Sequence, residues 1–213
     1  MLMNGSENSV LLVVDVQQDF CPGGSLPVPE GDAIIPLVNR LAARFRRVVA
    51  TQDWHPRNHV SFASNHPGAR PFDTIPGPAG EQILWPDHCI PGTPGARFHP
   101  ELDTLRFDLI LRKGTNPALD SYSAFFENDR KTPTGLHNYL NGLGIDSVYL
   151  AGLALDVCVF YSIMDAVKLG FQAVLVSDAC RAIDTPKGTL ATRLDEMREA
   201  GARIVESNEL EDA

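Results

Sequence analysis

The sequence predicts an α/β protein with three layers: a doubly wound, mostly parallel sheet of about six strands, with helices on both faces. Two observations carry this prediction. Short apolar runs alternate along the chain with segments whose apolar residues recur at helical spacing, which is typical of βαβ units. The chain also has 213 residues, of which 44% are hydrophobic and 21% charged. This length and composition favour one globular domain over residues 1–213.

The first strand is expected at 10–16, because a near-continuous apolar run suits a strand buried on both faces of a sheet. The first helix begins near Ile34, since apolar residues then recur at helical offsets as far as Phe45. The other expected elements follow in alternation: strands at 48–50, 107–111, 147–152, 172–177 and 202–205, and helices at 134–143, 157–169 and 188–200.

One long segment, residues 54–104, lacks any sustained period and holds nine of the sixteen prolines. Long irregular segments inside compact domains are either disordered or functional. Because this one keeps several aromatic residues, we expect an ordered excursion that binds metal and substrate. Residues 1–8 are polar for the most part, and we expect them to be flexible.

The charge balance excludes some classes of partner. Asp and Glu outnumber Lys and Arg by 27 to 18, so the net charge is -9. Nucleic acids and anionic membranes attract basic surfaces, so neither is an expected partner. No apolar run is long enough to span a membrane, and the first residues do not resemble a signal peptide. Four widely spaced cysteines indicate a reducing cytoplasm rather than a disulfide framework. A homo-oligomer is compatible with the sequence, although no feature encodes the oligomeric state.

Residues whose side chains could take part in catalysis or metal binding lie at the ends of the predicted strands. Asp15 closes the first strand, Asp53 and His55 follow the second, Lys113 follows the third, and Cys158 opens the helix after the fourth. Ligands of open α/β sheets bind beyond the carboxyl ends of the strands. The sequence therefore predicts that these groups converge at one edge of the sheet.

Cys158 is a candidate nucleophile, because the start of a helix favours the thiolate and offers unpaired N–H groups to an oxyanion. The alternative is a small buried hydrophobic residue. Asp15 is a candidate base, because burial raises the pKa of a carboxylate; the alternative is a turn cap. Lys113 would neutralise Asp15 or the thiolate, or would lie at the surface as an ordinary strand-end lysine.

A metal site is the third hypothesis. In an extended segment Asp53 and His55 point the same way, and His88 in Trp-Pro-Asp-His offers a third donor. Such a set suits one divalent ion, Zn most of all, or Fe or Mn. His59 is an additional donor or a neighbour of the ligands. The alternative is a solvated turn with a satisfied histidine.

The combination of motifs resembles the nicotinamidases (pyrazinamidases) of the isochorismatase-like cysteine hydrolase superfamily, from about Val10 to Val205. Five stretches carry the resemblance: Val-Asp15-Val-Gln-Gln-Asp-Phe20, Asp53-Trp-His55, Trp85-Pro-Asp-His88, Lys113-Gly with Tyr122-Ser-Ala-Phe, and Gly-Leu-Ala154-Leu-Asp-Val-Cys158. Family members often carry His where this chain has Val157, a difference that we expect to affect mainly the packing at the helix start.

The resemblance implies a role for each matching residue. Asp15, Lys113 and Cys158 correspond to the catalytic triad, and the N–H groups of Ala154 and Cys158 to the oxyanion hole, with a cis bond between Leu153 and Ala154. The remaining matches are the ring-binding walls Phe20, Trp85 and Tyr122, and the metal ligands Asp53, His55 and His88, with His59 open.

The implied activity is hydrolysis of nicotinamide, and of pyrazinamide, to the acid and ammonia through a cysteine thioester, in NAD salvage. The expected partner is thus a small carboxamide. Three alternatives remain. Another cysteine amidase, for a ureido or carbamoyl substrate, would not need the metal set. A vinyl-ether-cleaving hydrolase would lack Cys158, and a silent binding module would have lost part of the triad.

Overall fold

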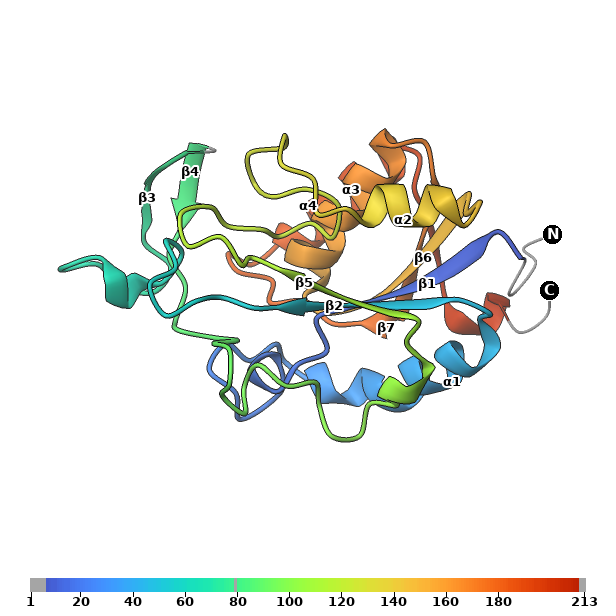
Figure 1. Cartoon of the computed structure of the whole chain (residues 1–213), viewed down its shortest axis with the longest axis horizontal. Helices are drawn as coiled ribbons and strands as arrows, with labels where there is room; N and C mark the ends of the chain where they lie inside the picture. Colours follow the sequence, from blue (N-terminus) through green and yellow to red (C-terminus); the bar gives the residue numbers. More distant parts are fainter. Residues whose placement is uncertain (1–6, 79, 211–213) are drawn as a thin grey trace.

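The computed structural model describes residues 7–78 and 80–210 and has a central sheet of six parallel strands in the order β5-β2-β1-β6-β7-β8 (Figure 1). The strands are β1 (Ser9–Val14), β2 (Val48–Asp53), β5 (Leu109–Lys113), β6 (Ser147–Gly152), β7 (Gln172–Cys180) and β8 (Arg203–Val205). The predicted fold class is therefore confirmed.

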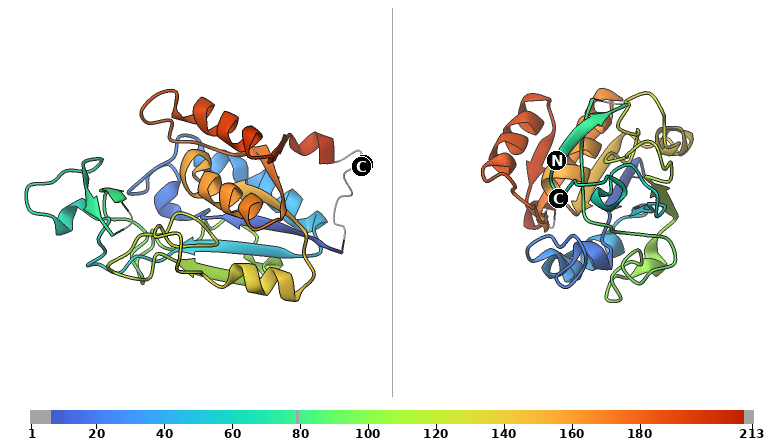
Figure 2. Two further views of the ribbon diagram at one scale, coloured as in Figure 1. Left: turned by 90° about the horizontal axis from the view of Figure 1, so that it is seen from above. Right: turned by 90° about the vertical axis from the view of Figure 1, so that its left-hand side faces the viewer.

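Helices cover both faces of this sheet (Figures 1 and 2). On one face α1 (Ile35–Arg44) packs on Leu11 and Val13 of β1 through its buried stripe. On the other face lie α2 (Leu136–Gly142), α3 (Phe160–Lys168) and α4 (Thr189–Glu199), whose buried residues join those of the alternate β1 positions. Because successive strand residues point to opposite faces, the single apolar run of β1 supplies both cores.

Several element boundaries near the sheet edge differ from the prediction. β2 extends to Asp53 and β5 to Lys113, so these two residues end their strands rather than follow them, and β7 extends to Cys180. β1 ends at Val14 rather than at residue 16, because Asp15 has a φ of 48° and turns the chain out of the strand. The helix expected from Val157 starts as a π-helical turn, Leu155–Val159, before α3 continues it. π-helical turns are rare and occur frequently at functional sites.

The described part of the long excursion contains an antiparallel hairpin of β3 (Thr74–Gly77) and β4 (Gly80–Ile83). Short, largely exposed strands with Pro76 leave no alternation for sequence analysis to detect. The remaining helical turns are short 3-10 segments: Gln18–Phe20, Gly31–Ile34, Ala63–Asn65, Thr104–Arg106 and Ser207–Leu210.

Two other expectations concern the chain ends and membranes. Of the segment 1–8 that was expected to be flexible, residues 1–6 lie outside the described residues. Within the described ranges, no helix has the length and apolar character that a bilayer crossing demands.

Candidate active site

Three strand ends and one helical turn bring the predicted triad together. Asp53 and Lys113 are the last residues of β2 and β5 and are partners in the parallel register. Asp15 follows β1, the neighbour of β2 on its other side, and Cys158 follows β6 in the π-helical turn. The parallel order of the strands therefore places all four side chains at one edge of the sheet, as the topology rule predicts.

Lys113 is the centre of this cluster. Its Nζ atom lies 2.8 Å from Asp15 Oδ2, pairs with Asp53 Oδ1, and donates to the carbonyl of Ser121 at 3.1 Å. The same nitrogen is 3.5 Å from the Cys158 sulfur. These three oxygens match the three N–H donors of an ammonium group, so the buried charge is fully partnered.

Asp15 is held by two neighbours. Besides Lys113, the Thr51 hydroxyl donates to Asp15 Oδ1 at 2.6 Å, and the Asp15 main-chain N–H donates back to that hydroxyl at 3.2 Å. One Asp15 oxygen and the Cys158 sulfur lie within 4.8 Å of each other. The carboxylate is therefore fixed within reach of the thiol.

Burial dominates the proton affinities of Asp15 and Cys158. It raises the pKa of Asp15 to about 6, although Lys113 opposes the rise. Burial also raises the pKa of Cys158 well above its usual value, which differs from the lowering expected at a helix start. The physical reason is that the sulfur is desolvated and faces two carboxylates. The resting group is thus a thiol, beside a carboxylate whose pKa lies near neutrality and suits a base.

Asp53, His55 and His88 form a second cluster on the solvent side of Lys113. Each offers one ligand atom, and these three atoms lie within 4.8 Å of one another. His55 Nδ1 bonds to the Gly114 carbonyl at 2.9 Å and His88 Nδ1 to the Pro86 carbonyl at 2.7 Å. A carbonyl only accepts, so both rings carry their proton on Nδ1 and leave the Nε2 lone pairs free.

The charge of the two clusters fits a bound cation. Within the part of the chain that the structure describes, two buried carboxylates, Asp15 and Asp53, pair with the single ammonium of Lys113. Asp53 Oδ2 points away from Lys113 and lies 3.5 Å from His55 Nε2 and 3.9 Å from His88 Nε2. A divalent ion bound there would offset the uncompensated negative charge and would use all three free donor atoms.

His59 belongs to an overlapping donor group with His55 and Asp120, whose ligand atoms also lie within 4.8 Å of one another. Its Nδ1 contacts the Ser61 hydroxyl at 2.7 Å, whereas the buried Nε2 has no hydrogen-bond partner among the described residues. The structure therefore places His59 beside the predicted metal ligands, on the side of Asp120.

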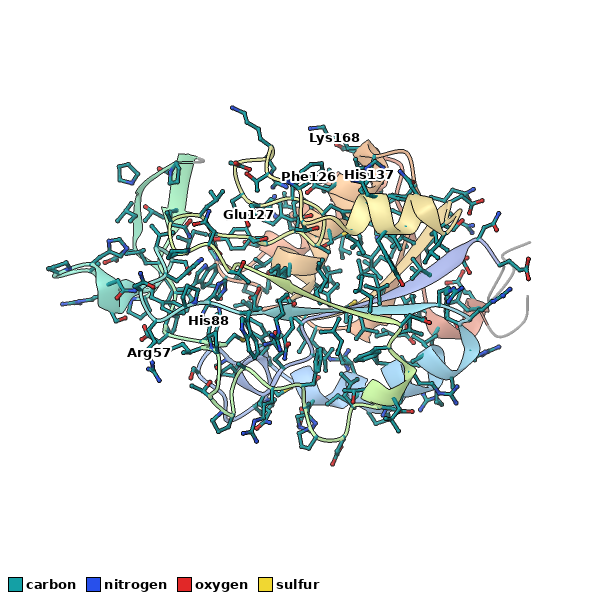
Figure 3. The ribbon with its side chains drawn as sticks, in the orientation of Figure 1. Arg57, His88, Phe126, Glu127, His137 and Lys168 are labelled. Atoms are coloured by element: carbon teal, nitrogen blue, oxygen red, sulfur yellow. The ribbon has the colours of Figure 1, made fainter. Side chains whose placement is uncertain are left out.

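One pocket opens onto both clusters. Its wall consists of Phe20, Leu26, Asp53, His55, Trp85, His88, Asp120, Tyr122, Ala154, Val157, Cys158 and Ile183. Figure 3 labels His88, which lies toward the end of the molecule that carries the β3–β4 hairpin. Asp15 and Lys113 are not among these residues, and they lie buried behind the sulfur, 0% and 2% exposed.

The three predicted ring-binding residues, Phe20, Trp85 and Tyr122, all line the pocket. The Trp85 indole N–H donates to the Tyr122 hydroxyl at 3.2 Å, and the rings of Phe20 and His88 lie 5.5 Å apart. Tyr122 in turn stacks on Tyr161 of α3. Aromatic side chains from three separate segments of the chain therefore contribute to the wall of one pocket.

Ala154 also lines the pocket, and the Leu153–Ala154 peptide bond is cis. Val157 lines the pocket as well, so our expectation that this position affects mainly helix packing was too narrow. Val157, Leu26 and Ile183 are aliphatic residues of the pocket wall, whereas Asp53, His55, His88 and Asp120 are its ionisable residues besides the thiol and the phenol.

Sequence analysis missed Asp120, a carboxylate that is 2% exposed and lies in the pocket wall. It accepts hydrogen bonds from Gln82 Nε2 of β4 at 2.9 Å and from the Ser121 N–H at 2.8 Å. The sequence feature that could have pointed to Asp120 is its position two residues before Tyr122. Leu26 and Ile183 were missed because an isolated aliphatic residue in a loop carries no pattern.

The four cysteines are free and buried, as the absence of a disulfide pattern predicts. Cys89, next to His88, is fully buried and has a φ of 49°, in the left-handed region of backbone conformation. Its thiol belongs to none of the three metal-type donor groups found among the described residues.

Comparisons with known proteins agree with this geometry. The nicotinamidase of Acinetobacter baylyi is 50% identical over 208 residues, covering 98% of this chain and 97% of that protein. The structure titled as the Acinetobacter baumanii nicotinamidase pyrazinamidase has 51% identity and a TM-score of 0.94, over 96% of this chain and 99% of the other. The pyrazinamidase of Pyrococcus horikoshii in complex with zinc has 38% identity and a TM-score of 0.76, over 93% and 99%.

The family comparison covers almost the whole described chain. The model of the isochorismatase domain matches residues 9–209, from the first residue of β1 to the last helical turn. All six strands and both residue clusters lie inside this range. The chain therefore belongs to the isochorismatase family.

Proposed function

We propose that this enzyme is a nicotinamidase, which hydrolyses nicotinamide to nicotinate and ammonia through a cysteine thioester. One observation carries the proposal: a thiol, a carboxylate and an ammonium lie in contact at a pocket whose wall contains the thiol and three metal-type donors. The similarity to nicotinamidases at 50% and 51% identity supports the same activity.

In the first step Asp15 accepts the Cys158 proton and the sulfur attacks the carboxamide carbon. Lys113 remains positively charged, because its two carboxylate neighbours outweigh burial and raise its pKa. The ammonium thus stabilises the thiolate at 3.5 Å as it forms. We assign the oxyanion hole to the main-chain N–H groups of Ala154 and Cys158, where each donor contributes about 3 kcal/mol to stabilisation of the transition state.

In the second step the carbon–nitrogen bond breaks. Asp15 returns its proton to the leaving nitrogen, ammonia departs, and the acyl group stays on Cys158 as a thioester. Water then attacks the thioester while Asp15 accepts a proton from it. The carbon–sulfur bond breaks, the thiol regains its proton, and nicotinate is released, which restores the starting state.

The ring is placed by two sets of residues. Phe20, Trp85 and Tyr122 would contact its faces, and Asp53, His55 and His88 would hold a zinc ion, with His59 close enough to contribute. An ion held there would supply a Lewis acid that could coordinate a ring nitrogen and so orient the ring. Pyrazinamide has the same size and a ring nitrogen at the same position, so we propose it as a second substrate.

The compartment follows from the thiols. Four free, buried cysteines, one of them the proposed nucleophile, suit a reducing environment, and we propose that the enzyme works in the cytoplasm.

The direct test is ammonia release from nicotinamide by the purified enzyme and by Cys158→Ala, each with its zinc content measured. We expect turnover by the unmodified enzyme and a loss of roughly 10⁴-fold or more in kcat for the variant. Cys180→Ala, which removes a buried thiol outside the pocket, is the control. Substantial turnover by Cys158→Ala, or none by the unmodified zinc-loaded enzyme, contradicts the proposal.

A further inference from the structure

A gap in the sheet lies directly beside the proposed ion site. β1 and β2 are paired through Leu11↔Val48, Leu12↔Val49 and Val13↔Ala50. β1 ends one residue later, at Val14, because Asp15 turns the chain away, while β2 continues to Asp53. The last residues of β2 therefore have no neighbouring strand on the β1 side, and their buried main-chain groups need other partners.

The side chain of Gln17 takes the place of the missing strand at Asp53. Its Oε1 accepts from the Asp53 N–H at 2.8 Å, and its Nε2 donates to the Asp53 carbonyl at 2.9 Å. The second Nε2 hydrogen is directed to the Ala96 carbonyl at 3.0 Å. Gln17 is 0% exposed, so the amide has exchanged every contact with water for these three bonds.

The side-chain carboxylate of Asp53, the residue whose main chain Gln17 holds, contacts both clusters. Oδ1 of Asp53 pairs with Lys113, and Oδ2 faces the free Nε2 atoms of His55 and His88 at 3.5 and 3.9 Å. A shift of the Asp53 main chain would move both oxygens together. The position of this one residue therefore decides the geometry on the lysine side and on the ion side.

We propose that Gln17 is a positioning residue: by clamping both main-chain groups of Asp53, it fixes how the Asp53 carboxylate is shared between Lys113 and the metal ion. The inference rests on the metal site proposed above and adds a residue that contacts neither ion nor substrate. Side chains that orient metal ligands typically change metal affinity by 10–100-fold when they are lost.

Gln52 offers a matched control. It precedes Asp53, is also buried, and donates to the same Ala96 carbonyl at 2.8 Å. Its other hydrogen bond is with Arg112, at 3.4 Å. Replacing either glutamine by Met removes a buried amide from the Ala96 carbonyl, but only the change at position 17 releases the main chain of Asp53.

The experiment titrates Co²⁺ into the ion-free full chain and into Gln17→Met and Gln52→Met, and records the dissociation constant and the visible absorption bands. We expect Gln17→Met to raise the dissociation constant by 10–100-fold and to change the bands. Gln52→Met should stay within about threefold at a similar Tm. At a saturating concentration of the ion, Gln17→Met should also lower kcat, because the Asp53 carboxylate that pairs with Lys113 is no longer held in place.

Equal effects of the two substitutions, or an unchanged Co²⁺ affinity in Gln17→Met, would overturn the inference. Should Gln17→Met fail to fold, Gln17→Asn carries the same test, because its amide is one methylene too short to reach both Asp53 groups. No Co²⁺ binding by the unmodified chain would overturn the metal site itself, and the inference with it. That result is distinguishable, because nicotinamide hydrolysis by the chain is measured separately.

Discussion

Asp53 and Lys113 face each other across the last register position of β2 and β5 and form an ion pair that is buried from solvent. The pair joins the thiol cluster to the donor cluster, because Lys113 also contacts Asp15 and Cys158 while Asp53 also faces His55 and His88. Neither cluster can be altered at this junction without a change in the other.

Replacement of Lys113 by Met should destabilise the fold as well as abolish turnover. It leaves Asp15 and Asp53 buried without their cation, a situation that typically costs about 3–5 kcal/mol of unfolding free energy. Denaturant unfolding measures the loss. Lys168→Met is the control, since Lys168 is exposed at the end of α3, on the side of the molecule away from His88 (Figure 3). A stability of Lys113→Met equal to that of the control would contradict the buried ion pair.

The substitution Gly114→Ala should weaken metal binding through His55. A Cβ atom at Gly114, where φ is +64°, would lie 2.2 Å from His55 Cε1 and force the ring away. Gly144→Ala is a matched control, because its φ is +69° and nothing lies within 4 Å of the added Cβ. Both variants should lose about 1–2 kcal/mol of stability from backbone strain. Only Gly114→Ala should show a higher dissociation constant for Co²⁺; equal metal affinity in the two would refute this prediction.

On the acidic side of the pH profile, kcat/KM should follow the titration of Asp15. The base must be deprotonated to accept the thiol proton, and burial raises its pKa to about 6, so kcat/KM should fall as the pH drops through 6. The Thr51 hydroxyl bond stabilises the carboxylate and lowers this pKa. Thr51→Val removes the bond and should therefore move the acid limb to higher pH. A limb that stays in place, or moves to lower pH, would show that another group titrates.

Alkylation should distinguish Cys158 from the other three thiols. Cys158 lines the pocket, whereas Cys21, Cys89 and Cys180 are 2%, 0% and 3% exposed and do not. Because burial keeps Cys158 as a thiol at rest, its reaction with iodoacetamide should be slow at pH 7 and should accelerate with pH. Mass spectrometry of the alkylated peptides measures how fast each cysteine is labelled, and nicotinamide should slow the labelling of Cys158 alone. Faster labelling of Cys180 than of Cys158 would contradict the pocket assignment.

Much of the fold could be predicted because it depends on local patterns. The apolar run of β1 and the helical spacing of α1 are properties of contiguous residues, and the edge of the sheet that collects the strand ends follows from parallel pairing alone. For the same reason Asp15, Asp53, Lys113 and Cys158 could be expected to meet before any coordinates were available.

The remaining features depend on contacts between distant segments. Gln17 reaches Asp53 across 36 positions and Asp120 accepts from Gln82 across 38, and neither partner leaves a mark on the sequence around the other. The β3–β4 hairpin is held by its pairing rather than by apolar alternation. The proton affinity of Cys158 was misjudged because a helix start is visible in the sequence, whereas desolvation by neighbouring elements is not.

The two-sided use of Asp53 has a consequence for how this enzyme could be studied. Since thermodynamic coupling between two binding sites is reciprocal, a compound that binds reversibly at Cys158 and shifts Lys113 must change the affinity for the proposed ion by the same factor by which the ion changes the affinity for that compound. The amount of ion retained during dialysis would then report binding at the Cys158 thiol, and the measurement would not require turnover.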